Sequence, residues 1–167
     1  PAHPQYANLL GYWPLDEGAG NSTSEAWGHS VAGLLMFDPH WVPQARPLQY
    51  SATSFSALTG TNQVLDLDGV DDYVRVPSGT WFSNEFTIES WVFERSYANS
   101  SRVMDFGNGS PSDNVILALT SGTTGRPYFQ TYPSGQYILA PDPIPLNQWM
   151  HVAATLKSNV ATLYYNG

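Results

Sequence analysis

Cysteine is absent from the 167 residues, so the chain can form neither a disulfide nor a thiolate metal site. Charge is scarce, because only 12% of residues are charged, and 14 acids outweigh 6 bases to give a net charge of -8. Nucleic-acid binding requires clustered Lys and Arg, and here the bases are scattered, so we expect no nucleic-acid partner. Apolar runs stay shorter than the roughly 20 residues that span a bilayer, so we expect no membrane insertion.

The chain is rich in apolar residues, which make up 42% of it, and in aromatic residues at 14%. This content excludes a disordered chain, and the length fits one domain over residues 1–167. A surface of uncharged polar residues is typical of a secreted or cell-surface protein. Three Asn-x-Ser/Thr sequons support an extracellular glycoprotein; they begin at Asn21, Asn99 and Asn108.

Thirteen prolines and 14 glycines are spread along the chain, and no segment carries a helical apolar period. Short alternating or apolar runs predict nine strands. These strands are Leu9 to Pro14, Val64 to Leu67, Asp72 to Val76, Phe86 to Phe93, Arg102 to Phe106, Val115 to Thr120, Pro127 to Tyr132, Trp149 to Leu156 and Ala161 to Tyr165. We therefore predict an all-β fold, a two-sheet antiparallel β-sandwich, with Gly33 to Thr61 as a long loop over it.

Six segments resemble, in order and spacing, the concanavalin A-like, LamG-like jelly-roll domains, also called laminin G-like or pentraxin-like. They are GYWPLDEGAG from Gly11, LDLDGVDDYV from Leu65, EFTIESWV from Glu85, RVMDFGNG from Arg102, NQWMHVAATL from Asn147 and ATLYYNG from Ala161. In this family further strands usually follow the last Asn-Gly. We therefore expect a jelly roll that lacks its last strands, a fragment of a larger protein, in which neighbouring segments or chains complete the sandwich.

The segment LDLDGVDDYV concentrates carboxylates around a glycine that permits a sharp turn. Asp68, Asp71 and Asp72 would repel one another unless a hard cation such as Ca²⁺ lay between them. The alternative is turn chemistry alone, in which aspartate side chains accept hydrogen bonds from backbone N–H groups. Both interpretations stay open.

A second acidic segment begins at Asp16, with Glu25 nine residues further on. The family resemblance implies that such a loop often closes around a structural calcium ion. Here the family's Asp-x-x-Gly is replaced by Glu25-Ala-Trp-Gly28, which keeps a carboxylate but lengthens its reach. Asp16 and Glu25 are therefore further candidate calcium ligands.

Signatures of catalysis are missing, because the chain contains no Gly-x-Ser-x-Gly and no His-Glu-x-x-His sequence. His151 alternates with apolar residues, which favours a histidine in the sandwich core over a general base. Glu89 and Glu94 are five positions apart and should point to opposite faces, which disfavours a glycosidase pair. We expect no enzyme activity.

Aromatic side chains in loops and near strand ends are the remaining candidates for ligand binding, because flat rings can stack on sugars. The alternative is that they hold loops onto the sandwich. The candidate ligand-binding residues are Trp27, Trp41, Tyr97 and Tyr132. The sequence therefore predicts a non-catalytic extracellular recognition module with a structural calcium ion, which binds a glycan or an extracellular protein in lectin-type recognition or cell adhesion. Two alternatives are a structural or assembly domain of a larger extracellular or filamentous protein and an accessory domain of a carbohydrate-active enzyme.

Overall fold

The computed structural model describes residues 8–26, 31–44, 63–107, 112–133 and 137–167. These residues form twelve β-strands, all paired antiparallel, as an all-β chain requires. The chain divides into two compact units, residues 1–81 and 82–167. The single domain over residues 1–167 stays a prediction.

The first unit contains two small sheets. Its three-stranded sheet has the order β1-β2-β5 and its two-stranded sheet pairs β3 with β4. The strands are β1 (Ser22–Thr23), β2 (Gly33–Met36), β3 (His40–Pro43), β4 (Gln63–Asp66) and β5 (Tyr73–Arg75). Strands β4 and β5 were predicted to within two residues at each end.

Two expectations for the first unit were wrong. Leu9 to Pro14 forms no strand, because the backbone of Tyr12 is bonded to the Glu25 carboxylate and to the amide of Ala26. The supposed loop from Gly33 contains β2 and β3. Pro43 is tolerated there because it is the last residue of β3, in a sheet of only two strands.

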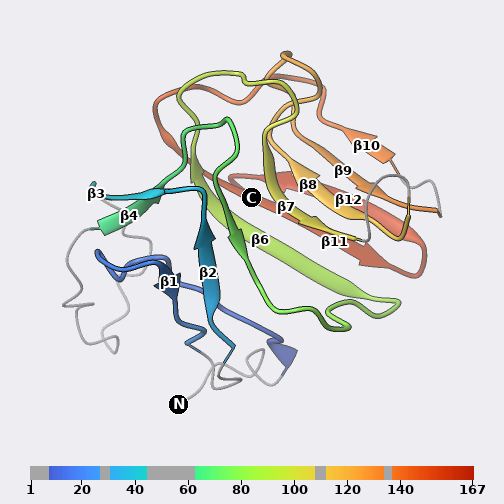
Figure 1. The fold of residues 1–167 in the computed structure, drawn as a ribbon. Coiled ribbons are helices and arrows are strands. Elements are labelled where there is room, and N and C mark those ends of the chain that lie inside the picture. The colour runs from blue at the N-terminus through green and yellow to red at the C-terminus, as the bar shows by residue number, and fades with distance from the viewer. Residues whose placement is uncertain (1–7, 27–30, 45–62, 108–111, 134–136) are drawn as a thin grey trace, which may run out of the picture. The chain divides into compact units, whose positions relative to one another are not determined.

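The second unit is a sandwich of two sheets (Figure 1). One sheet has the order β12-β11-β6 and the other the order β10-β9-β8-β7. The strands are β6 (Phe86–Phe93), β7 (Arg102–Phe106), β8 (Val115–Ala118), β9 (Tyr128–Thr131), β10 (Tyr137–Leu139), β11 (Trp149–Lys157) and β12 (Val160–Tyr165). The bounds predicted for β6 and β7 are confirmed, whereas β10 was missed because it is short.

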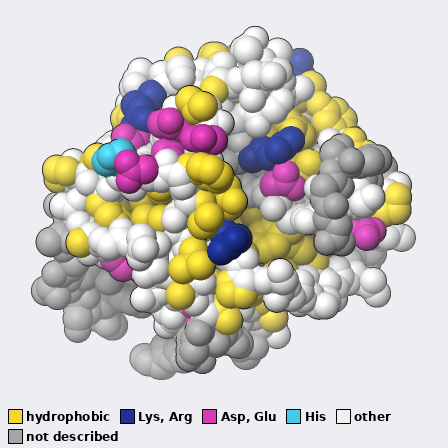
Figure 2. Space-filling view, viewed as in Figure 1, with side chains coloured by type: hydrophobic (Ala, Val, Ile, Leu, Met, Phe, Trp, Pro, Cys, Tyr) yellow, Lys and Arg dark blue, Asp and Glu magenta, His cyan; other side chains and the backbone are white. Residues whose placement is uncertain are grey.

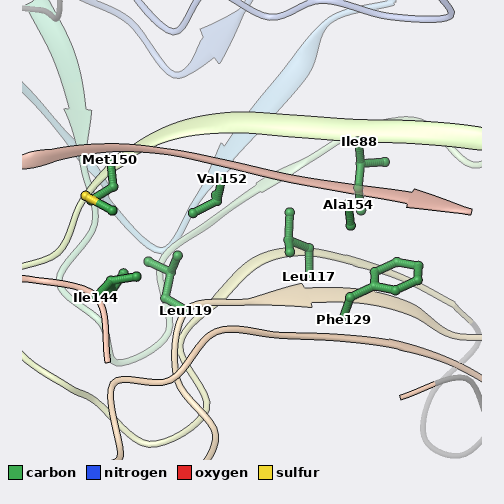
Figure 3. Packing of buried hydrophobic residues seen from close by; sticks show 8 residues of the cluster. All are labelled: Ile88, Leu117, Leu119, Phe129, Ile144, Met150, Val152 and Ala154. Carbon is green, nitrogen blue, oxygen red and sulfur yellow. The ribbon is translucent and has the colours of Figure 1, made fainter. Parts of the chain in front are cut away.

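The core of this sandwich lies between the two sheets (Figure 3). Alternate residues of β11, namely Met150, Val152 and Ala154, face Leu117 of β8 and Phe129 of β9. Apolar side chains at every second position of facing strands therefore close the interior, and the predicted two-sheet β-sandwich is confirmed.

A tight hairpin joins β11 to β12, as the Lys157-Ser-Asn-Val segment predicted. Lys157 pairs with Val160, so that only Ser158 and Asn159 form the loop. Both have positive φ, 50° and 63°, which is the geometry of a two-residue turn that matches strand twist.

Replacing Leu117 tests this core. The side chain is fully buried, so Leu117→Ala should remove about 2 to 5 kcal/mol from the free energy of unfolding, measured by urea denaturation. Val160→Ala is the control, because Val160 is 65% exposed and its truncation should cost less than about 1 kcal/mol. Equal losses in the two variants would contradict the assigned core.

Candidate functional site

A cavity of about 420 Å³ lies on the second unit, against the sheet face opposite the core. It is lined by Arg102, Asp105, Gly107, Asn114, Ile116, Tyr128, Gln130 and Tyr132. Strand alternation separates these side chains from the core. Leu117 and Phe129 point into the sandwich, whereas Ile116 and Tyr128 cluster on the other face.

Strand pairing brings the cavity residues together from distant parts of the chain. Ile116 of β8 lies between Asp105 of β7 and Gln130 of β9, in one row across the three strands. In the next row, Ala118 lies between Arg102 and Tyr128. The floor of the cavity is therefore part of the rigid sheet and not a loop.

An irregularity in β7 sets the charge of the cavity. Arg102 and Asp105 are three positions apart and would face opposite sides of a regular strand. Between Arg102 and Met104 the register with β8 shifts, and one extra residue is accommodated as a β-bulge. Both charged side chains therefore lie on the cavity face, where Nη1 of Arg102 is 3.2 Å from Oδ2 of Asp105, while Val103 and Met104 pack on the core.

Asn114 extends this polar network. Its Nδ2 donates to Oδ1 of Asp105 at 3.2 Å, and the carboxylate fixes the orientation of the amide because it can only accept. The residue is 5% exposed, and its Oδ1 has no hydrogen-bond partner among the described residues. Gly107 makes room for the amide, since a Cβ there would lie 2.4 Å from Nδ2.

Tyrosines form the aromatic part of the wall. Tyr128 is nearly buried and lies 5.7 Å from Tyr137, measured between ring centroids. Tyr132, a predicted ligand-binding residue, lines the cavity beside Asn114, and its amide donates to the Asn114 carbonyl at 2.8 Å. The structure therefore joins one predicted aromatic residue to polar groups at the end of β9.

The other predicted aromatic residues lie elsewhere. Tyr97 donates its hydroxyl to the carbonyl of Ile144 at 2.6 Å and is not in the cavity wall. Its ring packs over Gly125, where a Cβ would lie 2.4 Å away. Trp41, in the first unit, donates its indole N–H to the carbonyl of Gly20 at 2.9 Å. Trp27 lies outside the described residues, and ligand binding at all three stays a prediction.

The aspartates after β4 come together as the sequence predicted. Asp68, Asp71 and Asp72 each place one carboxylate oxygen within 4.8 Å of the other two. Turn chemistry is present as well, because Oδ1 of Asp68 accepts from the amide of Val70 at 2.7 Å and Oδ2 of Asp72 accepts from the amide of Asp68 at 3.0 Å. Gly69 has a φ of 77°, as a sharp turn there requires.

The second acidic segment uses a residue that sequence reasoning passed over. Glu17 accepts hydrogen bonds from the Thr23 hydroxyl at 2.8 Å and from the amide of Ser24 at 2.6 Å. Glu25 accepts from the amide of Tyr12 at 3.0 Å. Metal binding by Asp16 and Glu25 stays a prediction.

The acids considered for catalysis differ in environment. Glu89 is exposed and lies 3.7 Å from Nε2 of His151, whereas Glu94 is only 7% exposed. The expectation of a core histidine was wrong. His151 is half-buried against Trp91, on the face of β11 opposite the core residues Met150 and Val152.

Burial raises the pKa of Glu94 from its usual 4.5 to about 7. Neither carboxylate oxygen has a hydrogen-bond partner of good geometry in the described part of the chain. The nearby Ser101 hydroxyl lowers the pKa only in part, because it donates its own proton to the carbonyl of Ala98 at 3.1 Å. Glu94 is a buried acid that gains a proton near neutral pH.

Two of the predicted glycosylation sites are accessible. Asn21 and Asn99 have exposed side chains, and Asn108 lies outside the described residues. Glycosylation at all three stays a prediction.

Comparison with known proteins places the sandwich in a family. The family model described as the concanavalin A-like lectin/glucanases superfamily matches residues 68–167, more than half of the chain. The chain belongs to this superfamily. The predicted LamG-like jelly-roll resemblance is thereby confirmed, and a carbohydrate-binding or adhesion-type module is supported at the level of the superfamily.

This concanavalin A-like chain is also similar to a nonribosomal peptide synthetase, atrA, of Aspergillus terreus (strain NIH 2624 / FGSC A1156). The two are 26% identical over 163 residues, which cover 83% of this chain but 18% of the synthetase. No solved structure matches the chain significantly. The described residues contain no helix that is long and apolar enough to cross a membrane.

Four polar residues of the cavity were not predicted from the sequence: Arg102, Asp105, Asn114 and Gln130. A partial signal exists, since Tyr128, Gln130 and Tyr132 occupy alternate positions and so share a face. Asp105 and Gln130 meet only through the register of three strands, which the sequence alone does not specify.

Glu94→Gln tests the buried acid in this concanavalin A-like chain. The folded state holds a proton that the unfolded state loses above pH 4.5, so stability should fall as the pH rises from about 4.5 to about 7 and level off above that. The loss from this group is on the order of 3 kcal/mol. Glu94→Gln should flatten the pH dependence of the melting temperature and be more stable than the original chain at about pH 8.

Asp142→Asn is the matched control, because Asp142 is an exposed acid in the same unit and should leave that pH dependence in place. A Glu94→Gln variant whose melting temperature falls with pH as steeply as that of the original chain would contradict the buried-acid assignment.

Proposed function

We propose that the chain is a non-catalytic extracellular recognition module that binds a glycan in the cavity on β7, β8 and β9. The observation that carries the proposal is the cavity wall, which combines two tyrosines with a network of hydrogen-bonding side chains. Membership of a superfamily of lectins and glucanases supports the same ligand class.

The chemistry of the wall suits a sugar. A pyranose ring has apolar C–H faces, which pack on aromatic rings, and hydroxyl groups, which both donate and accept hydrogen bonds. Tyr128 and Tyr132 supply the rings, Arg102 supplies donors, and Asp105 supplies an acceptor. The volume of about 420 Å³ lies within the range of small-molecule sites, at the size of a mono- or disaccharide.

The absence of a second acid argues against hydrolysis in this cavity. Glycosidases require two carboxyl groups on either side of the scissile bond. Asp105 is the one carboxylate among the described residues that line the cavity, and Arg102 and Asn114 already contact it. A bound glycan would therefore be recognised and released unchanged.

A structural calcium ion at Asp68, Asp71 and Asp72 is a second part of the proposal. Carboxylate oxygens are the ligands that Ca²⁺ prefers, and the three residues each bring one within 4.8 Å of the others. Two oxygens are engaged by backbone amides, which leaves Asp71 and the second oxygens of its neighbours for the ion. The donor set fits calcium and would need further oxygens from backbone or water.

The partial match to the synthetase favours a second candidate function. Because 18% of that protein aligns with this chain, the same fold could serve as one module of a multidomain protein, with a protein ligand in place of a glycan. Binding to proteins and no glycan would favour this candidate.

A glycan array tests the proposed ligand class. The full chain should bind a subset of glycans, and Tyr132→Ala should weaken that binding about 3- to 10-fold, because one stacking ring is lost. Tyr164→Ala is the control, since Tyr164 is an exposed tyrosine on β12 that is not part of the cavity wall. A blank array with folded protein would overturn the proposal.

Calcium binding is tested by thermal unfolding with excess Ca²⁺ or EDTA. Calcium should raise the melting temperature of the original chain but not that of Asp71→Asn, which leaves the two aspartate hydrogen bonds of the turn in place. In EDTA this variant should be at least as stable as the original chain, because one of three neighbouring negative charges is removed. Asp142→Asn should keep the calcium response. Identical melting in Ca²⁺ and EDTA would rule out the site.

A further inference from the structure

We infer that the cavity selects uncharged glycans and excludes acidic ones. This inference rests on the proposed glycan-binding function and specifies its ligand class. It follows from the contacts that the charged and hydrogen-bonding side chains of the cavity wall make with one another.

Among the described residues that line the cavity, the one cation is paired with the one anion. Nη1 of Arg102 lies 3.2 Å from Oδ2 of Asp105, and the second oxygen of that carboxylate accepts from Asn114. The lining residues therefore carry no net charge. The guanidinium keeps further N–H donors, but a uronate, sialate or sulfate group that bound to them would lie close to the Asp105 carboxylate and be repelled by it.

One unpaired acceptor at the wall favours a ligand that donates a hydrogen bond. The Oδ1 of Asn114 is buried in the wall without a partner, and an unpaired buried carbonyl costs about 1 to 3 kcal/mol. A sugar hydroxyl or acetamido N–H can donate to such an oxygen, provided that the side chain shifts slightly to admit it. A carboxylate or sulfate oxygen has no proton to give and would be repelled.

The net charge of the whole chain also disfavours acidic glycans. The net charge is -8, and such a field lowers the local concentration of polyanions. On the face shown in Figure 2, acidic side chains gather beside a histidine, while basic side chains are few and separate. The surface in that view offers no basic patch that would attract an acidic polysaccharide.

Asp105→Asn is the decisive variant, because it frees the guanidinium of Arg102 while keeping the side-chain shape and an acceptor for Asn114. The probes are matched pairs of glycans that differ only by a terminal uronate, sialate or sulfate group. The original chain should bind the neutral members. The variant should gain at least about tenfold in affinity for the acidic members, and added NaCl should weaken that gain.

Two further variants keep the test interpretable. Asp113→Asn removes an exposed acid that is not among the lining residues and should leave the preference unchanged. The double variant Asp105→Asn with Arg102→Gln should lose the gain, because the freed cation is no longer present. Circular dichroism confirms that each variant is folded.

The outcomes separate the two claims. An original chain that prefers the acidic members would overturn this inference and leave glycan binding intact. The inference is also wrong if Asp105→Asn is folded and retains the original preference, or if Asp113→Asn changes it equally. A blank array with folded protein would overturn the proposed function itself.

Discussion

Alternation along β8 and β9 is the constraint on which both the stability and the proposed binding site of the second unit depend. Leu117 and Phe129 turn into the sandwich, and their neighbours Ile116 and Tyr128 turn to the cavity face. A shift of register by one residue would exchange these two sets. The core therefore holds the cavity floor in place, so that a ligand would meet side chains that are already ordered and would lose little freedom on binding.

The acids of the chain differ in function because their partners differ. Asp68 and Asp72 order a turn through backbone amides, and Glu17 joins Thr23 to the loop before it. Asp105 balances a guanidinium. Glu94 has no such partner among the described residues and is neutralised by a proton instead, at a pH up to about 7. In a chain with no disulfides and few bases, carboxylates thus make many of the hydrogen bonds and ion pairs that fix its turns and loops.

The sequence predicted features that depend on neighbouring residues. The strands from Phe86 to Phe93 and from Arg102 to Phe106 were correct, because their patterns are long enough to read. The aspartate turn was predicted because its members lie within five positions. The strand from His40 to Pro43 was hidden by a proline that a two-stranded sheet accepts at its end, and the strand from Gly33 to Met36 is only four residues long. The cavity was missed because pairing among three strands assembles it, and a bulge reverses the face on which Arg102 lies.

The bulge in β7 has a consequence for how this site can change over generations. Val103 packs on the core, so another apolar residue at that position would be accepted, and its deletion would restore regular alternation with Arg102 two positions from Asp105 and on the same face. Substitution of Arg102 or Asp105 can therefore change the charge of this pocket, whereas the loss of one codon at the bulge would take an apolar side chain from the interior and leave the charge pair in place.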